Sequence, residues 1–205
     1  MSFRVEDKYL LKKEEKFKVF SLIQNYGFEE KFKKRNITSI YFDNKYFSMF
    51  EDSEEGVTPR KKIRIRFYEN MVEHTSLEKK INAKEGKYKI SNKLNLIQMN
   101  NYITRGYYDA SYGNSYPVLE VNYDRFYFQK NNFRITLDFN IRFKNFINKN
   151  LNFYEDFLIL EVKILNKFNI PSELESLPLN KIRYSKYSQG IKKIFNKVDK
   201  NTLYF

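Results

Sequence analysis

Lys61-Lys62-Ile63-Arg64-Ile65-Arg66-Phe67 alternates cationic and apolar side chains from its second residue onward. Successive side chains of a β-strand point to opposite faces, so Lys62, Arg64 and Arg66 share one face and the apolar residues share the other. Like charges at every second position repel one another unless an anion lies between them. The stretch therefore predicts a strand with one apolar face and one face suited to negative charge.

The same alternation recurs in four other segments. The residues that share a face are Arg4, Glu6 and Lys8; Glu78 and Lys80; Arg134, Thr136 and Asp138; and Glu161 and Lys163. For any one strand, the solvent face of an antiparallel sheet is the alternative interpretation. A solvated face would tolerate Ser, Gln, Thr and Asn, whereas Arg, Lys and Glu predominate here, so the five strands together favour a functional face.

Strand signals outnumber helix signals along the chain. Strands are expected at Ser39–Phe42, Lys61–Phe67, Ser76–Ile81, Val118–Phe128, Phe133–Phe139 and Phe157–Ile164. Helices are expected over residues 11–26 with Gly27 as the stop, from Ser91 to near Gly106, at the Ser172–Glu175 capping box, and after Ser188, while Tyr107–Tyr116 is expected to be a loop. No repeat or linker is present, so residues 1–205 are predicted to form a single, strand-dominated α+β domain.

Composition excludes several classes of protein. Lys plus Arg is 38 and Asp plus Glu is 25, and the net charge of +13 favours a polyanionic partner. The absence of Cys excludes disulfides and thiolate chemistry, and a single His, His74, argues against a multi-histidine metal site. Neither of the common glycine-rich phosphate loops is present, so side chains must hold any phosphate. No signal peptide or membrane-spanning segment is expected, which favours the cytoplasm.

Closing the sheet into a barrel would turn the charged faces inward, under helices that cover the apolar faces. Such an interior suits a chain of phosphates, since Arg offers forked donors and Lys offers point charges. Two or three Glu side chains inside it would hold Mg²⁺ or Mn²⁺ through oxygen ligands.

Eight short motifs also resemble, in order, those of the VTC domain, the vacuolar transporter chaperone type of polyphosphate polymerase. They are Arg4-x-Glu6-x-Lys8-Tyr9, Ser39-Ile40-Tyr41-Phe42-Asp43, Lys62-x-Arg64-x-Arg66, Leu77-Glu78-x-Lys80, Tyr123-x-Arg125, Arg134-Ile135-Thr136-Leu137-Asp138, Leu160-Glu161-Val162-Lys163 and Tyr184-Ser185-Lys186-Tyr187. The chain is similar to the compact bacterial members, within the triphosphate tunnel metalloenzyme superfamily that includes the CYTH phosphohydrolases. The resemblance implies a closed antiparallel barrel of about eight strands.

The resemblance also implies a function and the residues that perform it. Members transfer the terminal phosphoryl group of ATP to a growing polyphosphate with Mn²⁺ or Mg²⁺. Phosphate binding would fall to Lys8, Lys62, Arg64, Arg66, Lys80, Arg125, Arg134 and Lys163. Arg183 and Lys186 would lie beside the transferring phosphate as catalytic residues together with Arg64 and Arg66, and the metal ligands would be Glu161, Glu6 and Glu78.

Two departures from the family pattern bear on the activity. The CYTH opening motif has two Glu before its Lys, whereas here Arg4 replaces the first, which makes two-metal hydrolysis less favoured. Arg183 occupies a position where Lys is expected, and its guanidinium cannot give up a proton.

Two alternatives to a polymerase stay open: a CYTH-type triphosphatase and a non-catalytic polyphosphate-binding module. Nucleic acid is not an expected partner, because it needs an open aromatic groove. The expected partners are ATP and polyphosphate, and a membrane-protein partner would not be visible in the sequence.

Overall fold

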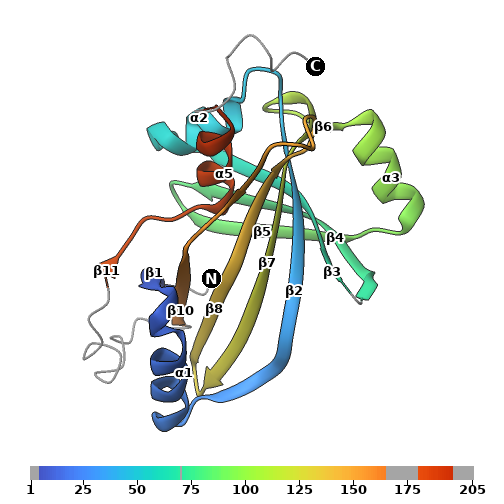
Figure 1. Cartoon of the computed structure of the whole chain (residues 1–205). Coiled ribbons are helices and arrows are strands. Elements are labelled where there is room, and N and C mark those ends of the chain that lie inside the picture. Colours follow the sequence, from blue (N-terminus) through green and yellow to red (C-terminus); the bar gives the residue numbers. More distant parts are fainter. Residues whose placement is uncertain (1–4, 70, 165–179, 196–205) are drawn as a thin grey trace. The chain divides into compact units, whose positions relative to one another are not determined.

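The computed structural model describes residues 5–69, 71–164 and 180–195 (Figure 1). Its strands are β1 Val5–Lys12, β2 Glu29–Asp43, β3 Arg60–Tyr68, β4 Met71–Ala83, β5 Gly86–Lys93, β6 Tyr107–Asp109, β7 Gly113–Lys130, β8 Phe133–Asn145, β9 Asn152–Tyr154, β10 Phe157–Ile164 and β11 Asn180–Lys181. Its helices are the 3₁₀ turn η1 Lys13–Glu15 and the α-helices α1 Lys16–Asn25, α2 Ser48–Glu55, α3 Leu96–Arg105 and α5 Lys186–Phe195. The strand-dominated α+β class is confirmed.

The strands form one large sheet in the order β11-β1-β10-β8-β7-β2-β3-β4-β5, with β6 paired to β7 and β9 to β8. Neighbours are antiparallel in the pairs β1–β10, β10–β8, β2–β3, β3–β4 and β4–β5. Within the residues that the structure describes, this path ends at β11 and β5. Among the described residues the sheet has eleven strands where about eight were expected, and no hydrogen-bonded pairing joins its two ends into a barrel.

The chain divides into two compact units. The first comprises residues 1–36, 123–141 and 154–184, and the second comprises residues 37–122, 142–153 and 185–205. The long strands β2, β7 and β8 contribute residues to both units.

Helix α1 covers the apolar face of the first unit (Figure 1). Val19 and Ile23 of α1 are buried in one cluster with Leu11 of β1, Leu137 of β8 and Leu160 of β10. The helix ends where Gly27 adopts a φ of +74°, a conformation that favours glycine. The stop is as predicted, but the helix is shorter than the expected residues 11–26, because Leu11 and Lys12 belong to β1 and Lys13–Glu15 form η1.

In the second unit, α2 and α3 cover the apolar face of β2, β3 and β4. Ile63, Ile65 and Leu77 are buried with Met49 of α2, and Met99 of α3 packs against them. The cluster contains the apolar half of the alternating stretch 61–67, so the predicted division of faces is confirmed.

Helix α5 lies beside α2 in the second unit (Figure 1). Gly190 of α5 is in close contact with β7 and β8, since a Cβ atom there would lie 2.5 Å from Leu119 Cδ2 and 2.9 Å from Phe143 Cδ1. A Cβ atom at this position would force the Leu119 or Phe143 side chain, or α5 itself, to move.

All six predicted strands are present, five within longer strands and Phe157–Ile164 as β10 itself, but several local predictions were wrong. The expected loop Tyr107–Tyr116 forms the hairpin of β6 and β7, because Asp109 accepts hydrogen bonds from Ser111 in the turn and from Lys61 of β3. The second helix begins at Leu96, where Asn95 and Gln98 form a capping box, and Ser91 belongs to β5.

The sequence analysis missed α2 and β5, and it began the last helix three residues late, since α5 starts at Lys186. The capping box at Ser172 lies outside the described residues. Among the described helices, none has both the length and the apolar character that a membrane crossing requires.

Candidate functional site

Arg64 lies at the centre of the charged face of the second unit. In the sheet it stands opposite Tyr41 of β2 and Glu78 of β4. Its Nε and Nη2 donate to Glu78 Oε2 at 2.9 and 2.6 Å, and its Nη1 donates to the Tyr41 hydroxyl at 2.9 Å. All three side chains are buried, so the guanidinium is held in one orientation.

Glu78 supplies the negative charge between the cations of this face. Lys89 Nζ donates to Glu78 Oε1 at 2.6 Å, and Arg66 Nη1 lies 3.9 Å from Oε2. Burial raises the pKa of Glu78, but the charges of Arg64 and Arg66 and the hydrogen bond from Lys89 outweigh it and hold that pKa well below its usual range. Both carboxylate oxygens therefore act as an internal counter-ion.

Lys62 connects this charged face to the start of α5. Its Nζ donates to Ser185 Oγ at 2.8 Å, and the backbone N–H of Ser188 donates to the same oxygen at 3.3 Å, as in a helix N-cap. Lys186, the first residue of α5, is half-buried. The positive end of the helix dipole adds to the charge of these lysines, which suits a bound anion.

Asp43, at the end of β2, anchors both α2 and α5. Its Oδ1 accepts from the backbone N–H groups of Asn44 at 2.8 Å and Met49 at 3.1 Å. Its Oδ2 accepts from the N–H of Phe50 at 3.0 Å and from the hydroxyl of Tyr187. Burial raises the pKa of Asp43 to about 6 despite these hydrogen bonds.

Glu161 is the central carboxylate of the first unit. In the sheet it stands opposite Lys8 of β1 and Thr136 of β8. Its Oε1 lies 2.8 Å from Lys163 Nζ and its Oε2 lies 3.9 Å from Arg125 Nη2. Burial raises the pKa of Glu161, but the charges of Lys163, Arg125 and Lys8 outweigh it and hold that pKa well below its usual range. Glu161 is therefore ionised at neutral pH.

Glu6 and Asp138 complete the charged face of the first unit. Glu6 Oε1 lies 3.3 Å from Lys8 Nζ, and its Oε2 lies 3.8 Å from Lys163 Nζ. Asp138 is fully buried and accepts from Nε of Arg125 and, at 2.7 Å, from its Nη2. Carboxylates hold the cations of this unit as they do in the second.

The residues of the first unit fit a hard divalent cation that binds together with phosphate. Glu161 and Glu6 offer two carboxylates beside the same Lys163, and the buried Thr136 Oγ1 makes no hydrogen bond. No group of three acidic or histidine side chains able to hold a metal occurs in the part of the chain that the structure describes. Mg²⁺ commonly takes one or two protein carboxylates and completes its shell with water and phosphate oxygens.

The other predicted cations are more exposed. Lys80 is exposed and stands opposite Lys62 and Lys89 in the sheet. Arg134 is exposed opposite Lys163, and Arg183 is exposed just before α5. The predicted residues thus fall into two groups: Lys62, Arg64, Arg66, Glu78, Lys80 and Lys186 in the second unit, and Glu6, Lys8, Arg125, Arg134, Glu161, Lys163 and Arg183 in the first.

Sequence reasoning missed several residues of these faces. Lys87, Lys89 and Lys93 alternate in β5 as the cations of β3 do, and this pattern was a usable signal. Asp138 shares the face of Thr136, but its pairing with Arg125 depends on two strands meeting in a particular register. No local pattern indicates that Tyr187 meets Asp43.

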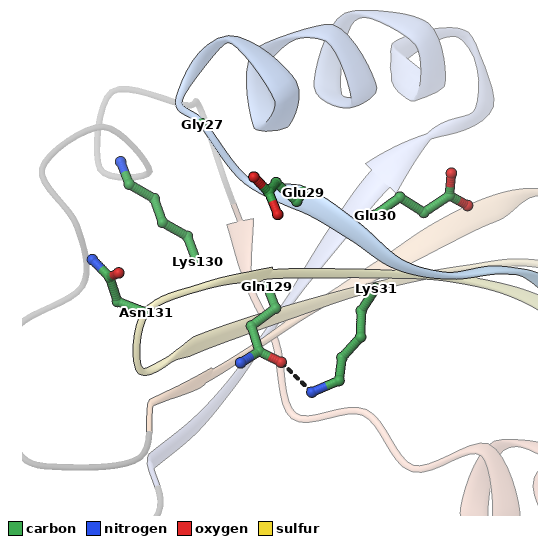
Figure 2. Close-up of a pocket in the computed structure, with 7 residues that line it drawn as sticks. All are labelled: Gly27, Glu29, Glu30, Lys31, Gln129, Lys130 and Asn131. Atoms are coloured by element: carbon green, nitrogen blue, oxygen red, sulfur yellow. Dashed lines mark hydrogen bonds between the residues drawn. The ribbon is translucent and has the colours of Figure 1, made fainter.

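A hollow of 360 Å³ in the first unit lies away from these residues (Figure 2). It is lined by Gly27, Glu29, Glu30, Lys31, Gln129, Lys130 and Asn131. Lys31 Nζ donates a hydrogen bond to Gln129 Oε1, and Lys130 Nζ donates to the carbonyl oxygen of Tyr26 at 2.7 Å. None of the site residues predicted from the sequence lines it, and its mixed charges favour no one ligand.

Solved structures of low sequence identity share this fold. A candidate adenylyl cyclase from Hippeastrum, described with a dominant triphosphatase activity, has a TM-score of 0.60 at 11% identity, over 93% of this chain and 96% of that one. A candidate adenylate cyclase from Vibrio parahaemolyticus has a TM-score of 0.57 at 14% identity, over 93% and 98%. The PH1012 protein of Pyrococcus horikoshii OT3 has a TM-score of 0.53 at 13% identity, over 81% and 80%.

No curated protein matches the sequence. The match to a family model is more specific than a shared fold, because it extends over all eight ordered motifs and the strands that carry them. The VTC domain matches residues 3–195, so the resemblance expected from those motifs is confirmed and the chain belongs to the VTC domain family.

Proposed function

We propose that this chain is an ATP-dependent polyphosphate polymerase, which transfers the terminal phosphoryl group of ATP to a growing polyphosphate. The observation that carries the proposal is that buried carboxylates and a tyrosine hold the cations of the two charged faces in place. Glu78 and Tyr41 fix Arg64, and Asp138 fixes Arg125. Donors fixed in advance stabilise charge on a phosphoryl group without the cost of reorganisation.

The carboxylates have a second role in this proposal. Without phosphate, Glu161 neutralises Lys163 at 2.8 Å. With phosphate bound, Lys163 would donate its hydrogen bonds to phosphate oxygens, and Glu161 with Glu6 would be free to hold Mn²⁺ or Mg²⁺. The metal would supply positive charge that offsets the charge of the phosphates. Bound triphosphate is therefore expected to raise the affinity of Glu161 and Glu6 for the metal.

The transfer itself needs no proton. An ionised terminal oxygen of polyphosphate attacks the γ-phosphorus of ATP, and the bond from that phosphorus to the β–γ bridging oxygen breaks. The electron pair leaves with ADP, and the polymer gains one phosphate. Arg64, Arg66, Lys80, Arg125 and Arg134 would bind phosphates, while Arg183 and Lys186 would stabilise the transferring group.

A triphosphatase is the second candidate, favoured by the activity described for the Hippeastrum protein. Hydrolysis needs a carboxylate that can orient or activate water. The central carboxylates Glu78, Asp138 and Glu161 are each within hydrogen-bond distance of cationic side chains. This pairing supports the polymerase over the triphosphatase.

The test is incubation of the purified chain with ATP and Mn²⁺, followed by separate measurement of ADP, free phosphate and polymer. ADP together with long polymer is the expected result. ADP with only free phosphate would favour the triphosphatase, and binding without nucleotide turnover would favour a polyphosphate-binding module. Glu161→Gln serves as the control for contaminating activity, because it should remove turnover of either kind.

A further inference from the structure

We infer that Tyr187 is a positioning residue: with Tyr41 it forms a stacked aromatic pair that orients Lys62 and Arg64 for phosphate. The inference rests on the phosphate binding proposed for β3. Tyr187 is 1% exposed and comes from α5, whereas Tyr41 comes from β2 and the two cations from β3. Three separate segments of the second unit therefore meet at this pair.

The two rings support the cations directly. Tyr41 and Tyr187 are stacked with centroids 5.1 Å apart and planes inclined by 28°. Lys62 Nζ lies 5.9 Å from the Tyr187 ring centroid, and the Arg64 guanidinium carbon lies 5.7 Å from that of Tyr41. Each cation also has a hydrogen-bond partner beside its ring, since Arg64 donates to the Tyr41 hydroxyl and Lys62 donates to Ser185. Cations near aromatic faces are attracted to them, which restricts where their N–H groups point.

Asp43 and Phe50 hold the Tyr187 side chain of this pair in place. The Tyr187 hydroxyl donates to the Asp43 carboxylate, which also accepts from the first N–H groups of α2. The Phe50 ring meets the Tyr187 ring edge-on, at 6.5 Å and 83°. Because Tyr187 follows Lys186 directly, the same anchor sets the first turn of α5.

The experiment measures metal-free binding of inorganic tripolyphosphate by calorimetry. Tyr187→Leu removes the ring and should weaken affinity about tenfold, whereas Tyr187→Phe keeps the ring and should weaken it only about twofold to threefold. Tyr112→Phe is the matched control, because the Tyr112 hydroxyl also donates to a carboxylate of the same unit, that of the half-buried Asp52, at 2.6 Å. It should lower thermal stability and leave affinity unchanged.

A double-mutant cycle separates positioning from general damage to the fold. When Lys62 and Arg64 are both replaced by Ala, Tyr187→Leu should change the remaining affinity by less than twofold, because its effect passes through those cations. An undiminished tenfold loss in that background would overturn the inference.

Folding and binding failures remain distinguishable. If Tyr187→Leu does not fold, Tyr41→Phe and Tyr187→Phe carry the cycle, with Arg64→Ala as the partner substitution for both. A wild-type chain that fails to bind tripolyphosphate would overturn the proposed function. A wild-type chain that binds, with all Tyr41 and Tyr187 variants equal to it, would overturn the positioning role alone.

Discussion

Arg64→Ala should weaken binding of inorganic tripolyphosphate by roughly tenfold to a hundredfold. Arg64 is buried on the charged face and its guanidinium is fixed by Glu78 and Tyr41, so little conformational freedom is lost when it meets phosphate. A hydrogen bond to a charged group contributes roughly 1.5–3 kcal/mol, and about 1.4 kcal/mol corresponds to a factor of ten. One such contact therefore gives the expected range.

Lys61→Ala is the matched control for this prediction. Lys61 lies three residues away on the same strand and carries the same charge, but it lies on the opposite face, where its Nζ donates to Asp109 at 2.8 Å and to Ser111 at 2.9 Å. Both substitutions remove one positive charge, so long-range attraction of the anion falls equally in the two variants. Lys61→Ala should lower the melting temperature and leave the affinity within about twofold of wild type. This change is smaller than the loss in affinity expected when one charged hydrogen bond to the ligand is removed.

The assay is calorimetric titration of each variant with tripolyphosphate in one buffer at one salt concentration, after thermal melting shows that the variant is folded. Equal losses at Lys61 and Arg64 would refute the argument, because the two faces of β3 would then be equivalent to the ligand.

Four further predictions concern Glu161, Lys186, Asp43 and Gly190. Glu161→Gln should abolish turnover at ordinary Mn²⁺ concentration while metal-free tripolyphosphate still binds; full activity at low metal would contradict the assigned role. Lys186→Ala should lower turnover at every metal concentration, and rescue by added metal would count against it. The pKa of Asp43 is raised to about 6 from 3.8, so the folded state binds the proton more tightly and the free energy of unfolding should fall by up to roughly 3 kcal/mol as pH rises from about 4 to 6, a slope that Asp43→Asn should remove in denaturant titrations. Gly190→Ala should destabilise the chain by roughly 1–3 kcal/mol through overpacking, whereas an unchanged melting temperature would show that α5 can shift.

The faces of the strands could be predicted because side-chain alternation is a local property. Ile63 and Ile65 are buried under helices and Arg64 is buried on the other side, as the spacing required. The partner of Arg64 could not be predicted, because it depends on the register between β3 and β4. Glu78 proved to be the anion that the repelling cations of β3 need, a role the sequence analysis left to the ligand.

The missed elements have a similar explanation. Helix α2 contains Glu51, Asp52, Glu54 and Glu55 and has no apolar stripe strong enough to predict it. Its start is capped by Asp43, which precedes the helix by several residues and also meets Tyr187 from a distant part of the chain. Contacts of this kind require the tertiary fold, and no local propensity encodes them.

The pairing of β1 with β10 also bears on the order in which the chain folds. Strands β3, β4 and β5 follow one another and pair in sequence, so they can form as soon as they are synthesised. Tyr9 of β1 pairs with Leu160 of β10, and this strand is among the last to be made. The first unit must therefore wait for almost the whole chain, with the loop-closure entropy that long-range pairing entails. Hydrogen exchange during refolding should accordingly protect the amides of β3 and β4 before those of β1.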